Sequence, residues 1–185
     1  MKIKLLSTLL LSAVSSVAYA GFADDLNKVG GGDVAAQAAE QVREKARAEG
    51  NSKIADQINQ KLLEEGKKNQ CSFKSGTADL EAGCGSKSKK LAETIVDAKK
   101  SLQSQGQTGF KFIVSGHTDT SGNAAKNKEL SARRAQVMVK ELIANGVNAG
   151  DIEAVGMGSE KPLMAKDDTP AKKAQNRRYE IAVRF

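Results

Sequence analysis

The hydrophobic and polar positions beyond residue 70 change repeatedly between helical spacing and strand spacing. Apolar side chains alternate with polar or small ones over residues 179–185, as they do in a half-buried strand. This mixture of spacings predicts an α+β sandwich. In chain order, the predicted elements are a strand at 72–74, a helix at 88–102, a strand at 110–115, a helix at about 124–144, a strand at 152–155 and a strand at 179–185.

Residues 32–66 have the spacing of helices and contain no run typical of a strand. We expect a first helix that ends at Gly50 and a second that Ser52 begins and Gly66 ends, because glycine favours helix C-termini and serine favours N-termini. Each predicted helix is short enough to be marginal alone. We therefore expect the pair to pack on the following domain, on a second copy of the chain or on a partner. The apolar positions of the second helix recur every four residues: Ile54, Ile58 and Leu62.

The first twenty residues differ from the rest of the chain. Two lysines precede an apolar run, which ends in the small-x-small sequence Ala18-Tyr19-Ala20. This order predicts a signal peptide over residues 1–20 that is cleaved after Ala20. No later apolar run reaches the roughly 20 residues that a membrane-spanning helix needs. We therefore expect an exported, soluble protein of the periplasm, associated with the outer membrane or cell wall, with no transmembrane segment in the mature chain.

Charge and composition narrow the partners of an exported chain. The sequence carries 29 Lys and Arg against 22 Asp and Glu, a formal net charge of +7, and the excess lies in residues 71–185. Such a surface attracts polyanions, although a lysine-rich surface can also be merely solvated. Outside the inner membrane the available polyanions are the cell wall and lipopolysaccharide, so no nucleic acid is expected. Only 4% of residues are aromatic, which argues against a stacking groove of the lectin type.

Two cysteines, Cys71 and Cys84, are separated by a short loop. In an oxidising periplasm such a pair predicts a disulfide, which would stabilise the fold by roughly 3 kcal/mol by closing the loop. The alternative is a pair of buried free thiols. A zinc site is not expected, because two cysteines and the one histidine of the chain do not provide four ligands.

The densest group of chemically versatile residues lies between residues 116 and 135. Asp119 follows a predicted strand in a turn, where its carboxylate can point into a cleft. Asn127 and Arg134 lie seven positions apart on the next predicted helix and therefore project from one face. Two interpretations are open. Arg134 and Asp119 either bind the carboxylate and the ammonium of a zwitterion, or pair with each other and merely fix the turn to the helix.

These residues belong to a series of motifs that follow one another along the chain: Gly116-His117-Thr118-Asp119-Thr120-Ser121-Gly122, Asn127-Lys128-Glu129-Leu130-Ser131-Ala132-Arg133-Arg134-Ala135, Gly156-Met157-Gly158, Pro162 and Asn176-Arg177-Arg178. In order and spacing the motifs resemble those of the OmpA-like (OmpA/MotB/Pal) peptidoglycan-binding domain family. The resemblance covers about residues 73–185. It implies a βαβαββ two-layer sandwich, preceded here by a short helical N-terminal segment. It also implies non-covalent binding of the peptidoglycan stem peptide through its diaminopimelate.

The resemblance further implies roles for individual residues. By their positions in the motifs, Asp119 and Arg134 are expected to hold the diaminopimelate zwitterion. Neighbouring residues before a strand point to opposite sides, so one of Arg177 and Arg178 is expected to serve the site and the other to pair with a carboxylate at the core edge. Four further residues are expected to line or shape the pocket: Asn127, Arg177, Thr118 and Leu130.

The chain departs from the family pattern in three respects. Lys126 stands where an aromatic residue is frequent. The pair Lys172-Lys173 replaces a frequent Gly-Arg and so removes a planar guanidinium. The two cysteines are not part of the pattern and are expected to brace the first strand against the first helix of the domain.

Enzymatic activity is not expected. His117 lies near possible nucleophiles in one turn, but a hydrolytic triad normally draws its members from separate segments. The sequence contains no Gly-x-Ser-x-Gly motif and no cluster of metal ligands. We expect His117 to be a structural hydrogen-bonding residue and expect no catalytic residue, cofactor or metal.

Three segments are therefore expected: a signal peptide at residues 1–20, a helical segment at 21–70 and a peptidoglycan-binding domain at 71–185. The expected function is peptidoglycan binding that links the cell wall to an envelope protein, which the N-terminal helices would contact. The alternative is a component of a flagellar, secretion or outer-membrane assembly that docks mainly through residues 21–70. A wall hydrolase is the third and least favoured interpretation.

Overall fold

The computed structural model describes residues 32–74 and 76–185. The predicted signal peptide at residues 1–20 lies outside the described residues and stays a prediction. The chain divides into two units between Glu49 and Gly50. This division precedes the boundary between residues 70 and 71 that the sequence suggested, and the second unit therefore includes the later part of the N-terminal helical segment.

A single helix, α2 (Gly32–Lys68), replaces the two helices that we predicted in the N-terminal segment. Gly50 lies inside this helix and is not among the glycines with positive φ, so it does not form the left-handed end that the prediction required. Gly66 is also helical, and the helix ends at Lys68. One glycine inside a helix costs only about 1 kcal/mol, whereas a break requires a second helix nucleus. The predicted break is therefore wrong.

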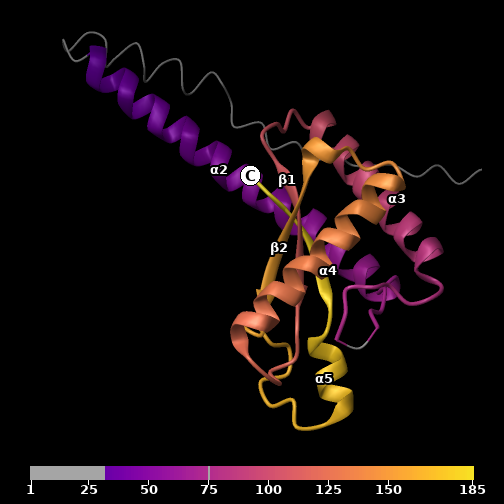
Figure 1. Ribbon diagram of the computed structural model, residues 1–185. Helices are drawn as coiled ribbons and strands as arrows, with labels where there is room; N and C mark the ends of the chain where they lie inside the picture. Colours follow the sequence, from indigo (N-terminus) through magenta and orange to yellow (C-terminus); the bar gives the residue numbers. More distant parts are fainter. Residues whose placement is uncertain (1–31, 75) are drawn as a thin grey trace, which may run out of the picture. The chain divides into compact units, whose positions relative to one another are not determined.

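The unit that begins at Gly50 contains most of the predicted strands and helices. Figure 1 shows its elements after α2, in chain order: α3 (Cys84–Ser104), β1 (Lys111–His117), α4 (Ala124–Ala144), β2 (Ile152–Gly158), α5 (Pro170–Asn176) and β3 (Tyr179–Arg184). The prediction of α4 is confirmed, and the predictions of α3, β1, β2 and β3 differ from the structure only at their ends.

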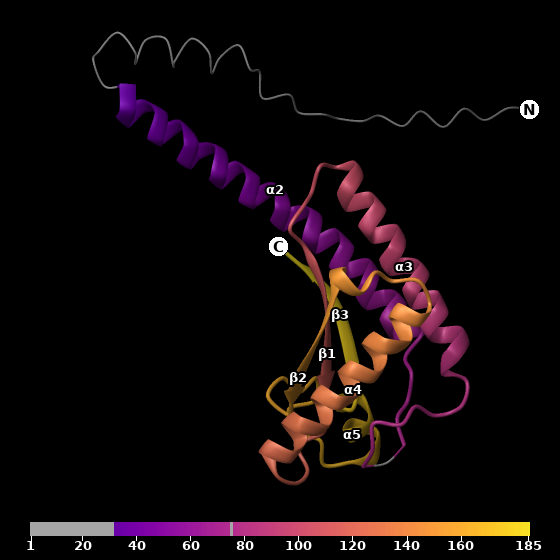
Figure 2. The same ribbon diagram turned by 45° about the horizontal axis from the view of Figure 1, so that its top comes forward.

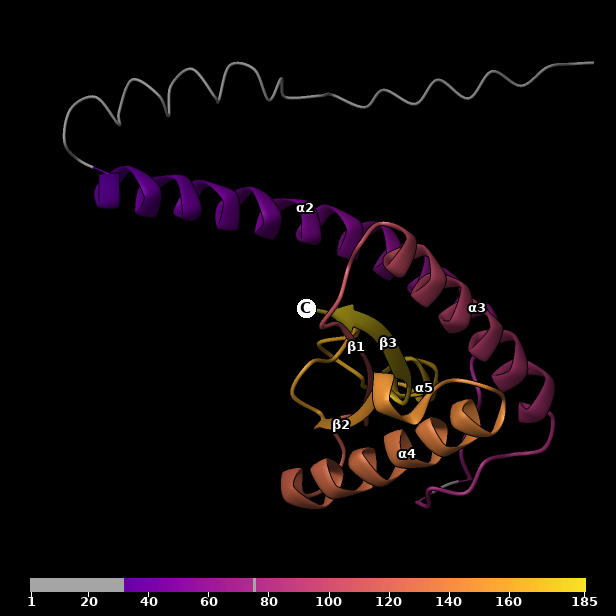
Figure 3. The ribbon, with the colours of Figure 1, turned by 90° about the horizontal axis from the view of Figure 1, so that it is seen from above.

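Within residues 32–74 and 76–185 the sheet has three strands in the order β2-β1-β3. Strand β1 runs parallel to β2 and antiparallel to β3. Helix α4 packs on β1 and β2 and also contacts α3, so these helices form a layer beside the sheet (Figures 2 and 3). The predicted two-layer α+β fold is confirmed.

The first predicted strand, at residues 72–74, is wrong. In place of a strand, Phe73 makes one isolated antiparallel bridge with Leu80. The Lys74 N–H donates to the Asp79 carbonyl at 2.9 Å and so closes a tight turn. Because the chain turns back at once, its backbone groups bond within this hairpin and not with the sheet.

The segment between β2 and β3 contains the short helix α5. Thr169 is its N-cap, because the Thr169 hydroxyl accepts a hydrogen bond from the Lys172 N–H at 3.3 Å. Pro170 occupies the first helical position, where the missing N–H of proline has no consequence. Figure 1 shows α5 at the end of the sheet where β1 and β2 end and α4 begins.

The part of α2 that follows Gly50 packs on its own domain. Leu62 is 1% exposed and belongs to the hydrophobic core, and Ile54 and Ile58 pack against that core. The Asn59 side chain bonds with both backbone groups of Val183: Nδ2 donates to the carbonyl at 3.3 Å, and the Val183 N–H donates to Oδ1 at 2.6 Å. Asn59 thus satisfies polar groups on the edge strand β3. Of the packing arrangements that the sequence left open, the structure shows the one against the following domain.

The core is mainly aliphatic, in keeping with the 4% of aromatic residues in the chain. No helix among the described residues is both long enough and apolar enough to cross a membrane. The largest completely buried apolar side chains come from α2, α3, β1, α4 and β3: Leu62, Leu91, Ile95, Leu102, Phe112, Val114, Met138, Leu142 and Val183.

Candidate functional site

A cleft of about 600 Å³ lies at the end of the sheet where β1 and β2 end. The structure brings to it all the residues that the sequence singled out for the pocket: Thr118, Asp119, Asn127, Leu130, Arg134 and Arg177. Sequence reasoning missed the lining that comes from the segment between α2 and α3: Gln70, Ser72, Phe73, Gly76 and Glu81. None of the family motifs named above lies in this segment. The only sequence signal in it is Cys71, which predicted a disulfide.

Two glycines let α4 lie directly on the strands. A Cβ atom on Gly116 of β1 would collide with the backbone carbonyl of Ser131 in α4. A Cβ atom on Gly156 of β2 would lie 2.6 Å from the carbonyl oxygen of Lys128, far closer than van der Waals contact allows. These motif glycines are therefore required for the close packing that determines where the side chains of α4 reach.

Ser131 connects α4 to the turn that carries Asp119. The Gly158 N–H donates to Ser131 Oγ at 2.8 Å, and the Gly158 carbonyl accepts from the Thr118 N–H at 2.9 Å. Ser131 is fully buried, so these hydrogen bonds are shielded from water. They hold the Asp119 turn in a defined position relative to Arg134, which lies about one helical turn beyond Ser131.

The Asp119 carboxylate accepts hydrogen bonds from two different parts of the chain. Oδ1 accepts from the Ser121 N–H at 3.1 Å, and Oδ2 accepts from Arg177 Nη1 at 2.9 Å. Partial burial by itself would raise the pKa of Asp119, but the bonds from Arg177 and Ser121 outweigh it and hold the pKa below its ordinary value. Asp119 is therefore ionised at neutral pH. Its oxygens keep lone pairs with which to accept from a further donor.

Asn127 supports the same turn from the first part of α4. Its Nδ2 donates to the Ser121 carbonyl at 2.9 Å and approaches the Asp119 carbonyl at 3.5 Å. Asn123 precedes the helix and is its N-cap, accepting from the Lys126 N–H at 3.1 Å. The Asp119 turn is therefore bonded to the beginning of α4 through backbone carbonyls, and the Asp119 carboxylate stays available to the cleft.

Arg134 is 5% exposed and has no carboxylate within ion-pair distance in the described chain. Its Nε donates to the Thr77 carbonyl at 2.9 Å, and Nη2 donates to the Lys74 carbonyl at 3.4 Å. The guanidinium carbon lies 5.1 Å from the centroid of the Phe73 ring, which is a cation–π distance. The interpretation in which Arg134 and Asp119 merely pair with each other is therefore wrong. The guanidinium has five N–H donors, more than these carbonyls use.

The neighbours Arg177 and Arg178 have different partners. Arg177 pairs with Asp119, while Arg178 Nε donates to Glu180 Oε1 at 2.7 Å. This division agrees with the expectation that only one of the two arginines faces the site. Burial, followed by repulsion from Arg177, lowers the pKa of Arg134. Two guanidinium groups thus act on the same cleft and favour an anionic group in a ligand.

Asp167 is a buried carboxylate that sequence reasoning missed. It accepts hydrogen bonds from the Thr120 N–H at 2.8 Å, from the Thr120 hydroxyl and from Asn176 Nδ2 at 3.0 Å. These bonds lower the pKa of Asp167 to about 2. Asp167 therefore ties the turn that carries Asp119 to the loop before α5. It lies in an irregular loop, where no periodicity identifies a buried position.

His117 is 2% exposed at the end of β1. We expected its ring to form structural hydrogen bonds, and this expectation is wrong: neither ring nitrogen has a hydrogen-bond partner among the described residues. The backbone N–H makes the bond here, donating to the Arg178 carbonyl at 2.8 Å, while Glu180 Oε2 lies 3.8 Å from Nε2. Burial, assisted by the charge of Arg178, lowers the pKa of His117 to about 4, so the ring is neutral at pH 7.

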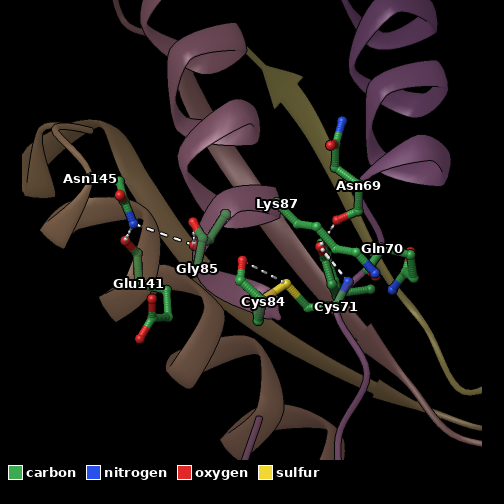
Figure 4. The surroundings of a disulfide bond; sticks show 10 residues. Asn69, Gln70, Cys71, Cys84, Gly85, Lys87, Glu141 and Asn145 are labelled. Carbon is green, nitrogen blue, oxygen red and sulfur yellow. Dashed lines mark hydrogen bonds between the residues drawn. A yellow bond between two sulfur atoms is a disulfide. The ribbon is translucent and has the colours of Figure 1, made fainter. Parts of the chain in front are cut away.

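Cys71 and Cys84 form a disulfide, which confirms the predicted pairing. Figure 4 shows that the bond joins the segment after α2 to the first turn of α3. The predicted brace against this helix is therefore present, although the segment that it braces is not a strand. The disulfide closes the loop that supplies Phe73 and the carbonyls bonded to Arg134.

The cleft combines groups of both charges. Carboxylates of Asp119 and Glu81 line it together with the guanidinium groups of Arg134 and Arg177. Thr118 also belongs to the lining, although its hydroxyl is buried and has no hydrogen-bond partner in the described chain. No group of three or more His, Cys, Asp and Glu side chains that could hold a metal ion occurs among residues 32–74 and 76–185. This arrangement suits a zwitterionic organic ligand.

Curated proteins similar to this chain include two whose names refer to peptidoglycan. The peptidoglycan-binding protein ArfA of Mycobacterium tuberculosis is 43% identical over 73 residues, which are 40% of this chain and 22% of ArfA. The peptidoglycan-associated lipoprotein of Pseudomonas aeruginosa is 35% identical over 82 residues, which are 44% of this chain and 46% of the lipoprotein. The match thus spans less than half the length of each relative.

Solved structures show the same fold. The peptidoglycan-associated lipoprotein from Burkholderia pseudomallei superposes with a TM-score of 0.51 at 25% identity, covering 62% of this chain and 89% of that one. The periplasmic domain of MotB from Helicobacter pylori superposes with a TM-score of 0.50 at 23% identity, covering 62% of this chain and 68% of that one. Residues 72–177, more than half of the 185 residues, match the OmpA family, and the chain therefore belongs to the OmpA family.

Proposed function

We propose that this protein binds peptidoglycan non-covalently and that its cleft holds the diaminopimelate of a stem peptide. The observation that carries the proposal is the placement of Asp119 and Arg134 in one cleft without an ion pair between them. Membership of the OmpA family supports the class of ligand, because similar chains include a peptidoglycan-binding protein and a peptidoglycan-associated lipoprotein.

The proposed recognition uses charge-assisted hydrogen bonds at both ends of the zwitterion. Arg134 donates to the carboxylate of diaminopimelate with the N–H groups that the loop carbonyls do not use. Asp119 accepts from the ammonium group through lone pairs that Ser121 and Arg177 leave free. Arg177 adds positive charge beside the carboxylate of the ligand.

The remaining predicted residues have supporting roles in this proposal. Asn127 holds the backbone of the Asp119 turn. Leu130 is half-buried in the lining and contacts the methylene chain of diaminopimelate. Thr118 lies beside Asp119 in the lining and shapes the cleft.

The proposed role is binding without catalysis in the periplasm, at the cell wall or outer membrane. The predicted signal peptide supports export. Similar chains also include outer membrane porin F of Pseudomonas fluorescens and outer membrane protein A of Klebsiella pneumoniae, whose names place them in the outer membrane.

Co-sedimentation with purified sacculi tests the site. Asp119→Ala and Arg134→Ala should each weaken binding by about 10- to 100-fold, since each removes a charge-assisted hydrogen bond of about 1.5–3 kcal/mol. Arg133→Ala is the matched control, because Arg133 is the exposed neighbour that pairs with Glu129 on the surface. Unchanged binding by both site variants, with circular dichroism showing intact folds, would refute the site.

We also propose that the N-terminal segment contacts an envelope protein. All side chains described between residues 37 and 49 are exposed, whereas those of Ile54, Ile58 and Leu62 pack with the domain core. Deletion of residues 33–49 should therefore leave sacculus binding unchanged and abolish cross-links to the partner in intact cells. Normal cross-linking after this deletion would contradict the docking role, as would loss of binding to purified sacculi.

A further inference from the structure

Arg134 is held in the cleft by groups that carry no charge. The Thr77 carbonyl accepts from Nε at 2.9 Å, and the Lys74 carbonyl accepts from Nη2 at 3.4 Å. The guanidinium carbon lies over the Phe73 ring, 5.1 Å from its centroid. Carbonyl oxygens and an aromatic face stabilise a cation without neutralising it, whereas a carboxylate in their place would cancel its charge. Arg134 therefore keeps its full positive charge for a ligand.

The two hydrogen bonds and the ring restrain the guanidinium in different ways. The hydrogen bonds fix the edge of the planar group that carries Nε and Nη2. They leave the group able to tilt about that edge, and contact with the face of the Phe73 ring limits this tilt. The adjoining edge, which carries Nη1 and the second N–H of Nη2, is left for a carboxylate. A carboxylate binds such an edge through two parallel hydrogen bonds, whose strength depends on the orientation of the plane.

Phe73 is itself held by the fold. Its backbone bridges with Leu80 across the hairpin of residues 72–74 and 76–81, and its side chain packs against the hydrophobic core. The residue two positions earlier, Cys71, is joined to α3 by the disulfide, and its N–H donates to Tyr179 Oη at 3.2 Å. The position of the Phe73 ring, and with it that of the Arg134 guanidinium, is therefore set by segments on both sides of the cleft lining.

Only one part of the ligand depends on this orientation. The proposed function, on which this inference rests, assigns Arg134 to the carboxylate of diaminopimelate and Asp119 to its ammonium group. A stem peptide with lysine in place of diaminopimelate has the same side chain and the same terminal ammonium group but lacks that carboxylate. An interaction that only one of two ligands makes determines the preference between them. The orientation of Arg134 therefore affects the diaminopimelate peptide and not the lysine peptide.

We infer that Phe73 is a positioning residue for Arg134 and thereby determines how strongly the cleft prefers diaminopimelate-type over lysine-type stem peptides. The ring acts on the guanidinium and not on the ligand. Without the ring, the guanidinium tilts away from the carboxylate, while the turn that carries Asp119 is unchanged because its hydrogen bonds come from Ser121, Asn127 and Arg177.

Titration calorimetry with two tripeptides tests this inference: L-alanyl-γ-D-glutamyl-meso-diaminopimelate and its lysine counterpart. Phe73→Leu keeps an apolar side chain but removes the aromatic face. It should weaken binding of the diaminopimelate tripeptide by about three- to tenfold, the effect of one cation–π contact, and leave the lysine tripeptide within twofold of wild type. Phe73→Tyr keeps the ring and should retain the preference. Phe185→Leu is the matched control, because Phe185 is a partly exposed phenylalanine outside the cleft.

A double variant separates positioning from direct contact and from folding. In an Arg134→Ala background, Phe73→Leu should have no further effect on the diaminopimelate tripeptide, because the residue through which the ring acts is absent. A further loss in that background would overturn the inference, since the ring would then contact the ligand. Equal weakening of both tripeptides by Phe73→Leu would also overturn it, since the ring would then only support the fold. If circular dichroism shows that Phe73→Leu does not fold, Phe73→Met, which also fills irregular apolar space, takes its place.

The same measurements distinguish failure of the inference from failure of the proposed function. A diaminopimelate affinity that Phe73→Leu leaves unchanged would overturn the inference alone, provided that the wild type prefers the diaminopimelate tripeptide. If the wild type binds neither tripeptide, or binds both equally, the proposed function fails and the inference fails with it.

Discussion

Arg177 donates a 2.9 Å hydrogen bond from Nη1 to Oδ2 of Asp119, although the two residues lie 58 positions apart in the chain. This pair joins the end of α5 to the turn after β1. The sequence alone leaves open a pairing of Asp119 with Arg134. Because Arg177 takes this role, Arg134 remains without a carboxylate partner in the described chain, and the Asp119 oxygens keep lone pairs for a further donor.

The first prediction concerns the pH dependence of binding. The hydrogen bond from Arg177 helps to hold the pKa of Asp119 below its ordinary value, so Arg177→Ala should raise that pKa. The proposed mode of binding uses ionised Asp119, and the pH at which sacculus binding is half lost on acidification should therefore move upward in the variant. Arg184→Ala, which changes an exposed arginine outside the cleft, should not move it. If this pH is the same in Arg177→Ala and in the wild type, the ion pair does not control the pKa of Asp119.

Asp167 should contribute to stability in acid. Its pKa is lowered to about 2 by the bonds from Thr120 and Asn176, so the folded state favours the carboxylate form. The resulting stability is fully present above the ordinary aspartate pKa of about 4 and is lost as the pH falls through about 2. Urea unfolding from pH 5 to 2 should show this loss in the wild type and a smaller one in Asp167→Asn. The matched variant Asp168→Asn, which changes an exposed residue paired with Lys172, should behave like the wild type.

His117 should contribute in a different pH range. Its pKa is lowered to about 4, while the unfolded chain titrates near the ordinary value of about 6.5. The unfolded state therefore binds a proton first, and stability should fall by up to about 3 kcal/mol as the pH decreases from 6.5 to 4. His117→Asn removes the titrating group and should flatten this part of the stability curve, measured by urea unfolding. The same slope in variant and wild type would assign the effect to another group.

Reduction of the disulfide should lower both stability and affinity. Cys71 and Cys84 close a loop with a sequence separation of 13, for which the chain-entropy model gives about 3 kcal/mol. The double variant Cys71→Ala/Cys84→Ala should lose about this much free energy of unfolding and should bind sacculi more weakly, because the loop that holds Arg134 is released. Wild type in reductant should match the double variant, and reductant should have no effect on the variant. Full stability and affinity in the double variant would contradict the role of the bond.

Gly50 tests whether α2 is continuous. In the structure Gly50 lies inside the helix, and a Cβ atom added to it would meet nothing within 4 Å. Gly50→Ala should therefore raise the free energy of unfolding by up to about 1 kcal/mol and increase the helical circular dichroism signal. A glycine with positive φ, such as Gly83 before α3, provides the contrast, because Gly83→Ala should destabilise the protein. Destabilisation by Gly50→Ala would restore the predicted break.

Local sequence patterns correctly predicted much of the unit that begins at Gly50. Helix α4 is amphipathic and has Asn123 as a cap, so its ends could be predicted from its own residues. The final strand alternates apolar and polar side chains because only one of its faces is buried. The disulfide followed from the expected compartment and the number of cysteines. In each case the information lies within a few neighbouring residues, or in the composition, and does not depend on how distant segments meet.

Other features depended on the tertiary structure. The strand predicted at residues 72–74 is only one bridge at Phe73, because the hairpin takes its hydrogen bonds. Gly50 could have ended a helix, but only the assembled fold shows that it does not. The pairing of Asp119 with Arg177 joins segments that no local pattern relates.

The sequence by itself determined the family, the main secondary structure and the motif residues that line the cleft. Only the tertiary structure decided which charged side chains pair with each other and which do not. It also decided that Gln70 lines the cleft and that Asp167 supports the turn beside it. The physical reason is that helix and strand periodicity reflects burial along one segment. A hydrogen bond between distant segments depends on distances of a few tenths of an ångström, which are set by the packing of the whole domain.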